Sequence, residues 1–530
     1  MKKNTMATAI VAGLAGVAGI ANISTAVNLN PDGVGQVLIY PYYTVNGGNT
    51  TVMSVVNTTS AGKAVKVRFL DARNSREVLD FNLYLSEYDV WTAGLFSLAD
   101  SGPGNIVTTD TSCTVPGIED GIFLLPTLAD GRRYFPFRTS AFTDFSAAGL
   151  NTGAFTRTRD GYIEIIEMGS IPTNSTFGSA LTHSNGRPGS CAFLEAAWLG
   201  SGSPGANGIW VQDPFFDLEP PSGGLFGGAA IVDVADGTYL SYNAEAIDGF
   251  SASIQHTAPG SQLPNLASVN STTPGNVTSY VFDRGRLITS NWSTAGGGGF
   301  RAVSALFMRE AVFNEYELDE NLGAGTEWVV TFPTRKFHVT GSTTFSAPFT
   351  NGYSGCERVS SRIYDREENT FALFDFSPGA GQQQVCWEAN PLWFSKTPLS
   401  SGSATPILGA PGAAGSVGSL WTGIPTYLEV FGIIQRTFTN GWFWLGFYDE
   451  NAINGQGIPT PLTRAPLVET NPGAGNTPDS YYGLPAVGFW ALRVVNVNQG
   501  AGLQASYAGA YPHRASRACF KGAYGTAPCD

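Results

Sequence analysis

The chain has 530 residues, of which only 13% are charged, and it contains 65 glycines. Its hydrophobic fraction of 43% is too high for a disordered chain, and its glycines follow no G-x-y period, which excludes a collagen-like fold. The formal net charge of −13 argues against nucleic acid or anionic lipid as a partner, because both interactions depend on basic side chains. We therefore expect a large, turn-rich β protein.

The N-terminus predicts a secretory signal peptide over residues 1–26. A basic Met-Lys-Lys start precedes an apolar stretch at residues 7–23, and small residues then lead to a cleavage site between Ala26 and Val27. A membrane anchor is the alternative, but the stretch is short and rich in Ala and Gly. Cleavage removes two lysines and no acidic residue, which changes the net charge from −13 to −15. We expect an exported protein in the periplasm, on the outer surface or outside the cell, with no membrane span after cleavage.

Residues 27–255 are expected to form an N-terminal β-sandwich domain. Segments rich in β-forming residues at 37–44 and 51–58 predict two strands, and alternation of apolar and polar residues at 65–71 and 78–85 predicts two more, with Gly- and Asn-containing turns along this stretch. This spacing is typical of an antiparallel sandwich, and the hairpin order is similar to that of immunoglobulin-like modules, although their Cys…Trp…Cys pattern is absent.

A long insertion is expected within this domain, from residue 99 to about residue 159. Gly161–Met168 then predicts a strong strand, and Cys191–Leu199 predicts a short helix. Two strands within Leu225–Ile247 are expected to complete the domain.

Residues 256–299 are polar and Gly-rich and are expected to form a connection between domains. Residues 300–530 are expected to form a second β-rich domain. Within it, Phe300–Tyr316 favours a helix, and Glu327–Val339 predicts a strand that Pro333 interrupts. Further strands are expected at 356–364, 384–393, 427–434, 442–447, 487–497 and 503–511.

The chain has six cysteines, an even number that indicates disulfides in an exported protein. We expect each cysteine to pair with its neighbour in the sequence. The expected pairs are Cys113–Cys191, Cys356–Cys386 and Cys519–Cys529. A metal site is the alternative, but the chain has no C-x-x-C motif, and only His513 lies near a cysteine pair.

Motifs for catalysis are scarce. The chain has only four histidines, His183, His256, His338 and His513, and no H-E-x-x-H motif. We expect none of the four to be catalytic. The segment 200–205 matches G-x-G-x-x-G but lacks the strand before it and the helix after it that a dinucleotide site needs, so we interpret it as a flexible turn.

Glu164 and Glu167 could in principle form the carboxylate pair of a glycoside hydrolase. Glu164 and Glu167 lie three residues apart in one predicted strand, so they should point to opposite faces and cannot form a glycosidase pair with each other. We expect one of them at the solvent-facing side and one at an edge.

Asp449, Asn451 and Asn454 offer oxygen atoms in a turn and are weak calcium candidates, since they lack the spacing of an EF-hand. No other cofactor is expected.

Aromatic clusters offer a possible sugar site. Trp442–Trp444 and Tyr40–Tyr43 place aromatic side chains on both faces of their predicted strands. Sugar rings stack on exposed aromatic rings, but we favour burial of both clusters between layers.

Four segments carry a resemblance to a known group of proteins: LNPDGVGQVLIYPYYT, the following stretch from TTVMSVVNTTS to EYDVWTA, GYIEIIEMG and EWVVTFPTRKF. The chain resembles large exported β-rich proteins of Gram-negative proteobacteria, a group without an assigned activity. The resemblance implies export and a β-rich fold, and it implies no catalytic residue.

The sequence therefore predicts a non-enzymatic, secreted or cell-surface structural or adhesion protein that assembles with itself or with other surface proteins. A low density of charge favours such contacts. The alternative is a carbohydrate-active protein, either a glycan-binding module or a glycoside hydrolase that uses carboxylates distant in sequence.

Overall fold

The computed structural model is mainly β with a few short helices, as the sequence predicts. The residues that it describes are 26–118, 125–139, 154–200, 207–270, 274–341, 343–352, 356–371, 384–397, 404–411, 423–430, 433–447, 464–498, 500, 504–523, 525 and 527–530. The signal peptide expected at residues 1–26 lies outside this part of the chain, apart from Ala26, which begins strand β1.

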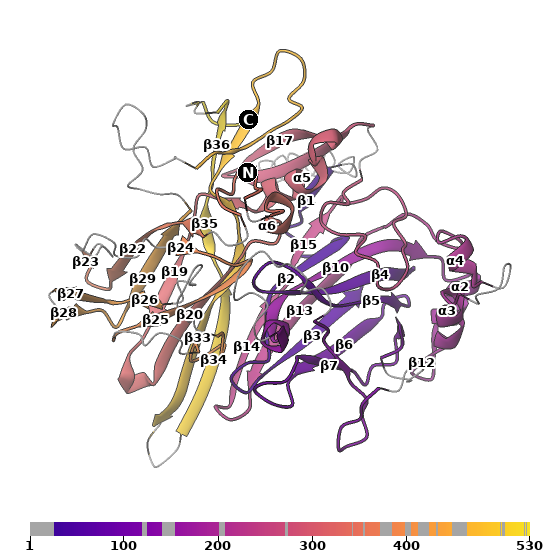
Figure 1. Cartoon of the computed structure of the whole chain (residues 1–530), viewed down its shortest axis with the longest axis horizontal. Helices are drawn as coiled ribbons and strands as arrows, with labels where there is room; N and C mark the ends of the chain where they lie inside the picture. Colours follow the sequence, from indigo (N-terminus) through magenta and orange to yellow (C-terminus); the bar gives the residue numbers. More distant parts are fainter. Residues whose placement is uncertain are drawn as a thin grey trace, which may run out of the picture.

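A nine-stranded sheet and a six-stranded sheet form the first sandwich (Figure 1). The nine-stranded sheet contains, in spatial order, β17 (Arg286–Ser293), β16 (Asn276–Asp283), β1 (Ala26–Leu29), β15 (Glu245–Asp248), β2 (Val37–Thr44), β10 (Asp160–Ile171), β4 (Gly62–Asp71), β5 (Glu77–Leu85) and β8 (Cys113–Val115). The six-stranded sheet contains β14 (Thr238–Asn243), β13 (Leu225–Asp233), β3 (Asn49–Asn57), β6 (Val90–Phe96), β7 (Asn105–Val107) and β9 (Phe135–Pro136).

Two five-stranded sheets form the second sandwich. The outer five-stranded sheet contains β23 (Thr370–Phe371), β22 (Ser360–Asp365), β29 (Asn440–Gly446), β19 (Ala311–Glu317) and β35 (Arg514–Ser516). The inner five-stranded sheet contains β26 (Gly423–Pro425), β25 (Ala389–Ser395), β20 (Ala324–Thr331), β33 (Val487–Asn498) and β34 (Gln504–Pro512). Trp328, Phe394 and Phe443 pack between them with ring centroids 5.1–5.4 Å apart.

Smaller elements complete the described chain. The short strands are β11 (His183–Ser184), β12 (Arg187–Pro188), β18 (Met308–Arg309), β21 (Glu357–Arg358), β24 (Gln384–Val385), β27 (Tyr427–Val430), β28 (Ile433–Thr437), β30 (Leu467–Val468), β31 (Asp479–Tyr482), β32 (Leu484–Pro485) and β36 (Ala518–Lys521). The helices are η1 (Ala154–Thr158), α2 (Thr176–Leu181), α3 (Cys191–Ala197), α4 (Ile209–Gln212), η2 (Thr294–Gly296), α5 (Gly298–Phe307), η3 (Glu320–Leu322) and α6 (Arg335–His338). The expected helix at 191–199 is therefore present as α3.

The two sandwiches share a hydrophobic core. Val329 and Phe489 point from the inner five-stranded sheet into the core of the first sandwich. The Phe489 ring stacks on Tyr242 with the centroids 4.8 Å apart. Both faces of the strands β20 and β25 are thus covered, and nearly all of their residues are buried.

Residues 256–299 were expected to form a polar connection between domains, and this expectation is wrong for the second half of the segment. Strands β16 and β17 form a hairpin there, and β16 joins the nine-stranded sheet through parallel pairing with β1. The inward positions of β16 and β17 do not form a continuous apolar pattern, because Ser279 and Ser290 occupy two of them. Ser279 accepts a hydrogen bond from the indole of Trp292 at 2.9 Å, and Ser290 donates to Asp479 at 2.8 Å, so both serines are satisfied inside the core.

Two further expectations are correct only in part. The helix expected over Phe300–Tyr316 ends at Phe307 (α5), and the chain continues as β18 and β19, where Val312 and Tyr316 alternate into the second core. The strand expected over Glu327–Val339 ends at Thr331, two residues before Pro333, and the single turn α6 follows.

Glu327 of β20 binds a loop that packs into the core of the first sandwich, and it gives a prediction on pH. Its buried carboxylate accepts hydrogen bonds from the backbone of Ile407 at 2.6 Å and Leu408 at 3.1 Å, and burial raises its pKa to about 7. The unfolded carboxyl loses its proton near pH 4.5. The folded state therefore holds the extra proton between these values, and this group's stabilising contribution is lost as pH rises through 7.

We compare the free energy of unfolding of the wild type with that of Glu327→Gln. The wild-type value minus the variant value should decrease by about 1–3 kcal/mol between pH 4.5 and pH 8. Urea unfolding of both proteins across this range measures it. Titrations common to both chains, such as that of Glu388, cancel in the difference. A difference that stays constant or rises with pH would contradict the assignment.

Candidate functional site

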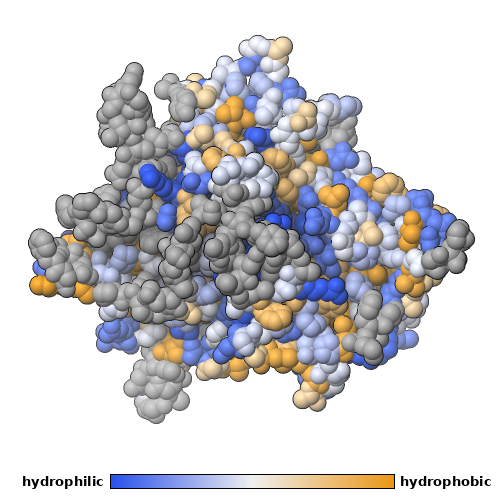
Figure 2. All heavy atoms as spheres, in the orientation of Figure 1, coloured by the Kyte–Doolittle hydropathy of each residue, from blue (hydrophilic) through white to orange (hydrophobic). Residues whose placement is uncertain are grey.

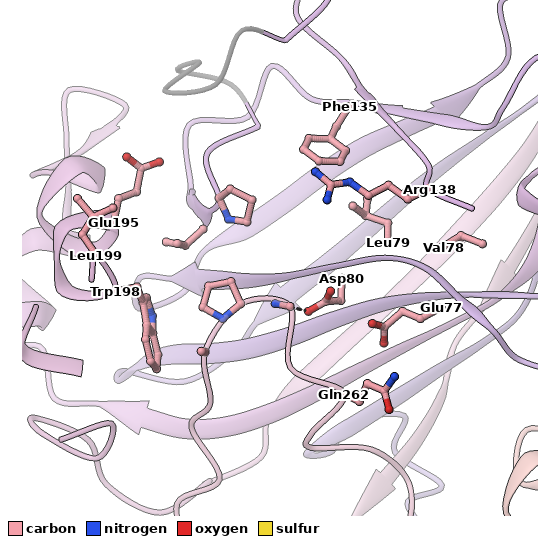
Figure 3. A pocket seen from close by; sticks show the side chains of 15 residues that line it. Glu77, Val78, Leu79, Asp80, Phe135, Arg138, Glu195, Trp198, Leu199 and Gln262 are labelled. Atoms are coloured by element: carbon pink, nitrogen blue, oxygen red, sulfur yellow. Dashed lines mark hydrogen bonds between the residues drawn. The ribbon is translucent and has the colours of Figure 1, made fainter. Parts of the chain in front are cut away.

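A cleft of about 690 Å³ opens at one end of the nine-stranded sheet (Figure 3). This volume is in the range of sites for small organic ligands. Its walls come from β5, the turn after β8, residues 135–138, the end of α3 and the loop at 258–262. The polar side chains that line it are Glu77, Asp80, Arg138, Glu195 and Gln262.

A β-bulge places two of these carboxylates on the same face. On β5, Leu79 pairs with Phe69 and Glu77 pairs with Leu70, so Val78 is the extra residue. Without the bulge, Glu77 and Asp80 would point to opposite faces, since their spacing is odd. Bulges re-aim side chains in this way and are common beside functional sites.

Glu77 and Asp80 form what is called here the floor of the cleft, and the net charge of the floor with its bound cations is close to zero. Glu77 accepts a hydrogen bond from the Arg68 guanidinium at 2.7 Å. Asp80 accepts one from the backbone of Gly260 at 2.8 Å and lies 3.5 Å from the Lys66 ammonium. Burial raises the pKa of Glu77 above its usual value and lowers the pKa of Lys66 to about 8. Each carboxylate of the floor therefore already has a cation.

Trp198 forms an aromatic wall of the cleft, and hydrogen bonds on the side away from the cleft fix its ring. Its indole donates to the Tyr84 hydroxyl at 2.7 Å, and this hydroxyl lies 2.9 Å from Nε2 of His256. Nδ1 of His256 lies 2.7 Å from the Pro214 carbonyl. Burial lowers the pKa of His256 to about 3, so the neutral ring donates to Pro214 and accepts from Tyr84. These bonds hold the Trp198 ring in one orientation.

The other walls add an aromatic, a cation and an acid. Arg138 lies with its guanidinium carbon 5.2 Å from the centre of the Phe135 ring. Glu195 comes from α3, and Figure 3 shows it on the side of the cleft away from Asp80 and Glu77. A disulfide between Cys113 and Cys191 joins β8 to the first residue of α3 and so connects two of the walls.

The two glutamates singled out in the sequence lie outside the cleft. Glu164 and Glu167 point to opposite faces, as expected, but both are fully buried on a strand between β2 and β4, so the expected solvent-facing and edge positions are both wrong. Glu164 lies between Arg68 at 2.8 Å and Lys336 at 2.7 Å. Glu167 pairs with Lys63 at 2.8 Å. Loops and the second sandwich cover the outer face of β10, which the pattern of a single strand does not reveal.

The four histidines lie apart from one another along the fold. His338 lies in α6 rather than in a strand and contacts Ser304 at 2.9 Å, and burial lowers its pKa to about 3. His513 contacts the Val329 carbonyl at 2.9 Å, and His183 contacts Ser86 at 2.9 Å. Only His256 lies next to the cleft, behind Trp198.

The aromatic clusters behave differently from each other. Tyr40, Tyr42 and Tyr43 are fully buried, as expected. The expected burial is wrong for Trp442, which is 42% exposed on the outer five-stranded sheet. Its ring stacks on Tyr364 with the centroids 4.5 Å apart. The Trp444 ring lies beneath the Arg362 guanidinium at 5.0 Å. Each tryptophan ring therefore already has a neighbour on one face, Tyr364 for Trp442 and Arg362 for Trp444.

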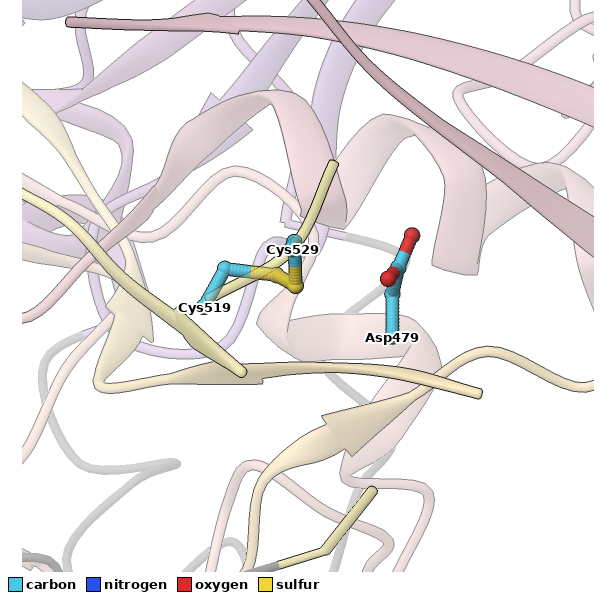
Figure 4. A group of neighbouring side chains, drawn as sticks. All are labelled: Asp479, Cys519 and Cys529. Carbon is cyan, nitrogen blue, oxygen red and sulfur yellow. A yellow bond between two sulfur atoms is a disulfide. The ribbon is translucent and has the colours of Figure 1, made fainter. Parts of the chain in front are cut away.

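The six cysteines form the three expected pairs in the structure. In the described part of the chain, one group of side chains, Asp479, Cys519 and Cys529, is compact enough to hold a metal ion (Figure 4). Its two sulfur atoms are bonded to each other, and Asp479 already pairs with Lys521 at 2.9 Å. A disulfide offers no thiolate, so this donor set does not suit a metal. The calcium candidates Asp449, Asn451 and Asn454 lie outside the described residues, as do residues 201–205 of the G-x-G-x-x-G match.

Sequence reasoning did not identify the residues of the cleft. Asp80 lies in the segment predicted as a strand and Glu77 immediately before it, while Glu195 and Trp198 lie in the segment predicted as a helix. One signal was available, because two adjacent apolar residues, Val78 and Leu79, interrupt the alternation of β5. No family model, curated protein or solved structure matches the chain. Among the residues that the structure describes, no helix has the length and hydrophobicity of a membrane span.

Proposed function

We propose that the protein is an exported, non-enzymatic surface or secreted protein that binds a neutral carbohydrate in this cleft and acts in adhesion or in the structure of the cell surface. The observation that supports the proposal is a fixed indole, Trp198, beside polar side chains whose charges are already compensated. A pyranose ring has an apolar C–H face that stacks on an indole and hydroxyl groups that donate to carboxylates.

The charges of the cleft favour a neutral ligand over an ion. A cation would compete with Arg68 and Lys66 for Glu77 and Asp80, which already have these partners. An anion would face three carboxylates and the single lining cation Arg138. Sugar hydroxyl groups can add hydrogen bonds to paired carboxylates without displacing their cations.

Export is supported by the three disulfides, which persist in oxidising compartments. The signal peptide predicted from the sequence is consistent with this compartment. An acidic, disulfide-linked protein of this kind reaches glycans of the cell envelope or of the surroundings.

A glycoside hydrolase is the second candidate. Glu195 stands across the cleft from Asp80 and Glu77 (Figure 3), and burial raises the pKa of Glu77, as in a general acid. Binding ranks first because Glu77 remains paired with Arg68 and Asp80 with Lys66 and Gly260, which leaves neither free to act as a nucleophile.

The proposal predicts the effect of removing the aromatic wall. The mature protein should bind a neutral oligosaccharide on an array of neutral, amino and uronic-acid glycans. Trp198→Ala should weaken that binding about tenfold or more, since a stacking surface of this size contributes more than 1.4 kcal/mol. Calorimetric titration with the best neutral oligosaccharide measures the change. Gln262→Ala, on an exposed loop, should weaken it with no effect on folding.

Trp442→Ala is the matched control, because it removes an exposed tryptophan far from the cleft and should leave the affinity unchanged. Binding that survives both Trp198→Ala and Gln262→Ala would place the sugar elsewhere. An absence of binding to every neutral glycan would refute the proposal. Release of reducing ends that Glu195→Gln abolishes would instead establish the hydrolase.

A further inference from the structure

The outward side of the six-stranded sheet has no charged residue on its four longest strands. Side chains of β6, β3, β13 and β14 alternate between the core and the outside. The outward residues, called here the neutral face, are Val90, Thr92, Gly94, Phe96, Thr50, Val52, Ser54, Val56, Phe226, Gly228, Ala230, Val232, Tyr239, Ser241 and Asn243.

Large apolar side chains are exposed across this face. Val90 is 47%, Val52 44%, Phe226 42% and Tyr239 59% exposed. Hydrophobic residues gather along the lower part of the view in Figure 2, where Figure 1 places β3, β6 and β7. The solvent side of an antiparallel sheet is ordinarily polar, and a contiguous exposed apolar patch marks an interaction site.

The outer five-stranded sheet provides a contrast within the same protein. Its exposed aromatic residue Trp442 has charged neighbours on the same face, among them Arg362 and Glu315. The outer five-stranded sheet therefore has charged side chains where it meets water, whereas the four long strands of the neutral face have none.

We propose that the neutral face is the interface of a homodimer, in which two copies pack their six-stranded sheets face to face. A twofold interface brings each residue patch against the same patch of the second copy. A chain with a net charge of −13 repels its own copy over most of its surface. The neutral face is a surface on which two copies meet without opposing like charges.

Face-to-face packing also fits the edge of the sheet. The edge strand β14 lies beside β34 of the second sandwich (Figure 1), and the adjoining turn is fixed by an ion pair between Asp236 and Arg493 at 2.5 Å. Addition of a second copy at this edge is blocked by the protein itself. We therefore place the partner on the open side of the sheet rather than at the β14 edge.

The size of the face indicates a weak, reversible dimer. Four strands of about seven residues cover roughly 19 by 23 Å at the usual strand spacing and rise. Two such faces bury roughly 900 Å² in total, which is typical of transient complexes. We therefore expect self-association at micromolar concentrations. A dimer would present two clefts and so raise the avidity for a multivalent glycan.

Sedimentation velocity of the mature protein between 1 and 200 µM tests the proposal. The wild type should shift from monomer to dimer over this range. Phe226→Glu should weaken association at least tenfold, because the new carboxylates of the two copies lie within the same interface. Trp442→Glu adds the same charge on the other sandwich and should leave association unchanged.

A charge swap separates a lost interface from a damaged fold. Phe226→Glu mixed with Phe226→Lys should form a heterodimer that neither variant forms alone. A wild type that is monomeric at 200 µM, or a dimer that Phe226→Glu leaves intact, would overturn the proposal. Glycan binding by monomeric Phe226→Glu should match that of the wild-type monomer, so failure of the dimer and failure of the cleft are distinguished.

Discussion

Replacement of Glu164 by alanine is expected to lower the free energy of unfolding by about 3–5 kcal/mol. The Glu164 carboxylate is fully buried and holds two cations, Arg68 of β4 at 2.8 Å and Lys336 of α6 at 2.7 Å. Arg68 keeps Glu77 as a partner when Glu164 is removed, but the ammonium of Lys336, whose side chain is 13% exposed, loses its ion pair. Urea unfolding of both proteins at pH 7 measures the loss.

The control is Glu320→Ala, which removes an exposed carboxylate that pairs with Lys396 at 2.7 Å. Exposed ion pairs contribute at most about 1 kcal/mol. The double variant Glu164→Leu with Lys336→Met should recover much of the stability, because it removes both charges of the pair together. A loss below about 1 kcal/mol in Glu164→Ala, or a double variant less stable than the single one, would contradict the role of this ion pair.

The position of Glu164 illustrates which structural features the sequence revealed. Runs of β-forming residues predicted β2, β3 and β10, alternation of apolar and polar residues predicted β4, and all four strands are present. The odd spacing of Glu164 and Glu167 also predicted that their side chains point to opposite faces. The environment of Glu164 was not predictable in this way, because Lys336 is distant in sequence and reaches Glu164 only when α6 packs against the outer face of β10. Contacts between distant segments are absent from any local pattern.

The cleft was missed for a related reason. Its carboxylates come from β5 and α3, and the bulge at Val78 changes the face on which Glu77 lies. Alternation assumes a regular strand, so it assigns the wrong face beyond a bulge. The disulfides, by contrast, were predictable, since an even number of cysteines in well-separated pairs suggested neighbours in the sequence.

Removal of the Cys113–Cys191 disulfide, by serine at both positions, is expected to lower the free energy of unfolding by about 4–5 kcal/mol. The bond closes a loop with a sequence separation of 78 residues, and the entropy that it removes from the unfolded chain increases with loop length. Denaturant unfolding without reductant measures the loss. Removal of Cys519–Cys529, with a separation of only 10, is the matched control and should cost about 3 kcal/mol.

The two disulfides should differ more strongly in their effect on ligand binding. Cys191 is the first residue of α3, and Cys113 begins β8, so their bond holds the wall with Glu195 and Trp198 against the wall with Val115. Without it, the two walls lose their covalent spacing, and we expect weaker glycan binding even where the protein remains folded. The Cys519–Cys529 pair packs beside α5, away from the cleft, and its removal should leave the affinity unchanged. Equal effects of both removals on binding would mean that stability alone, rather than the spacing of the walls, limits the affinity of the cleft.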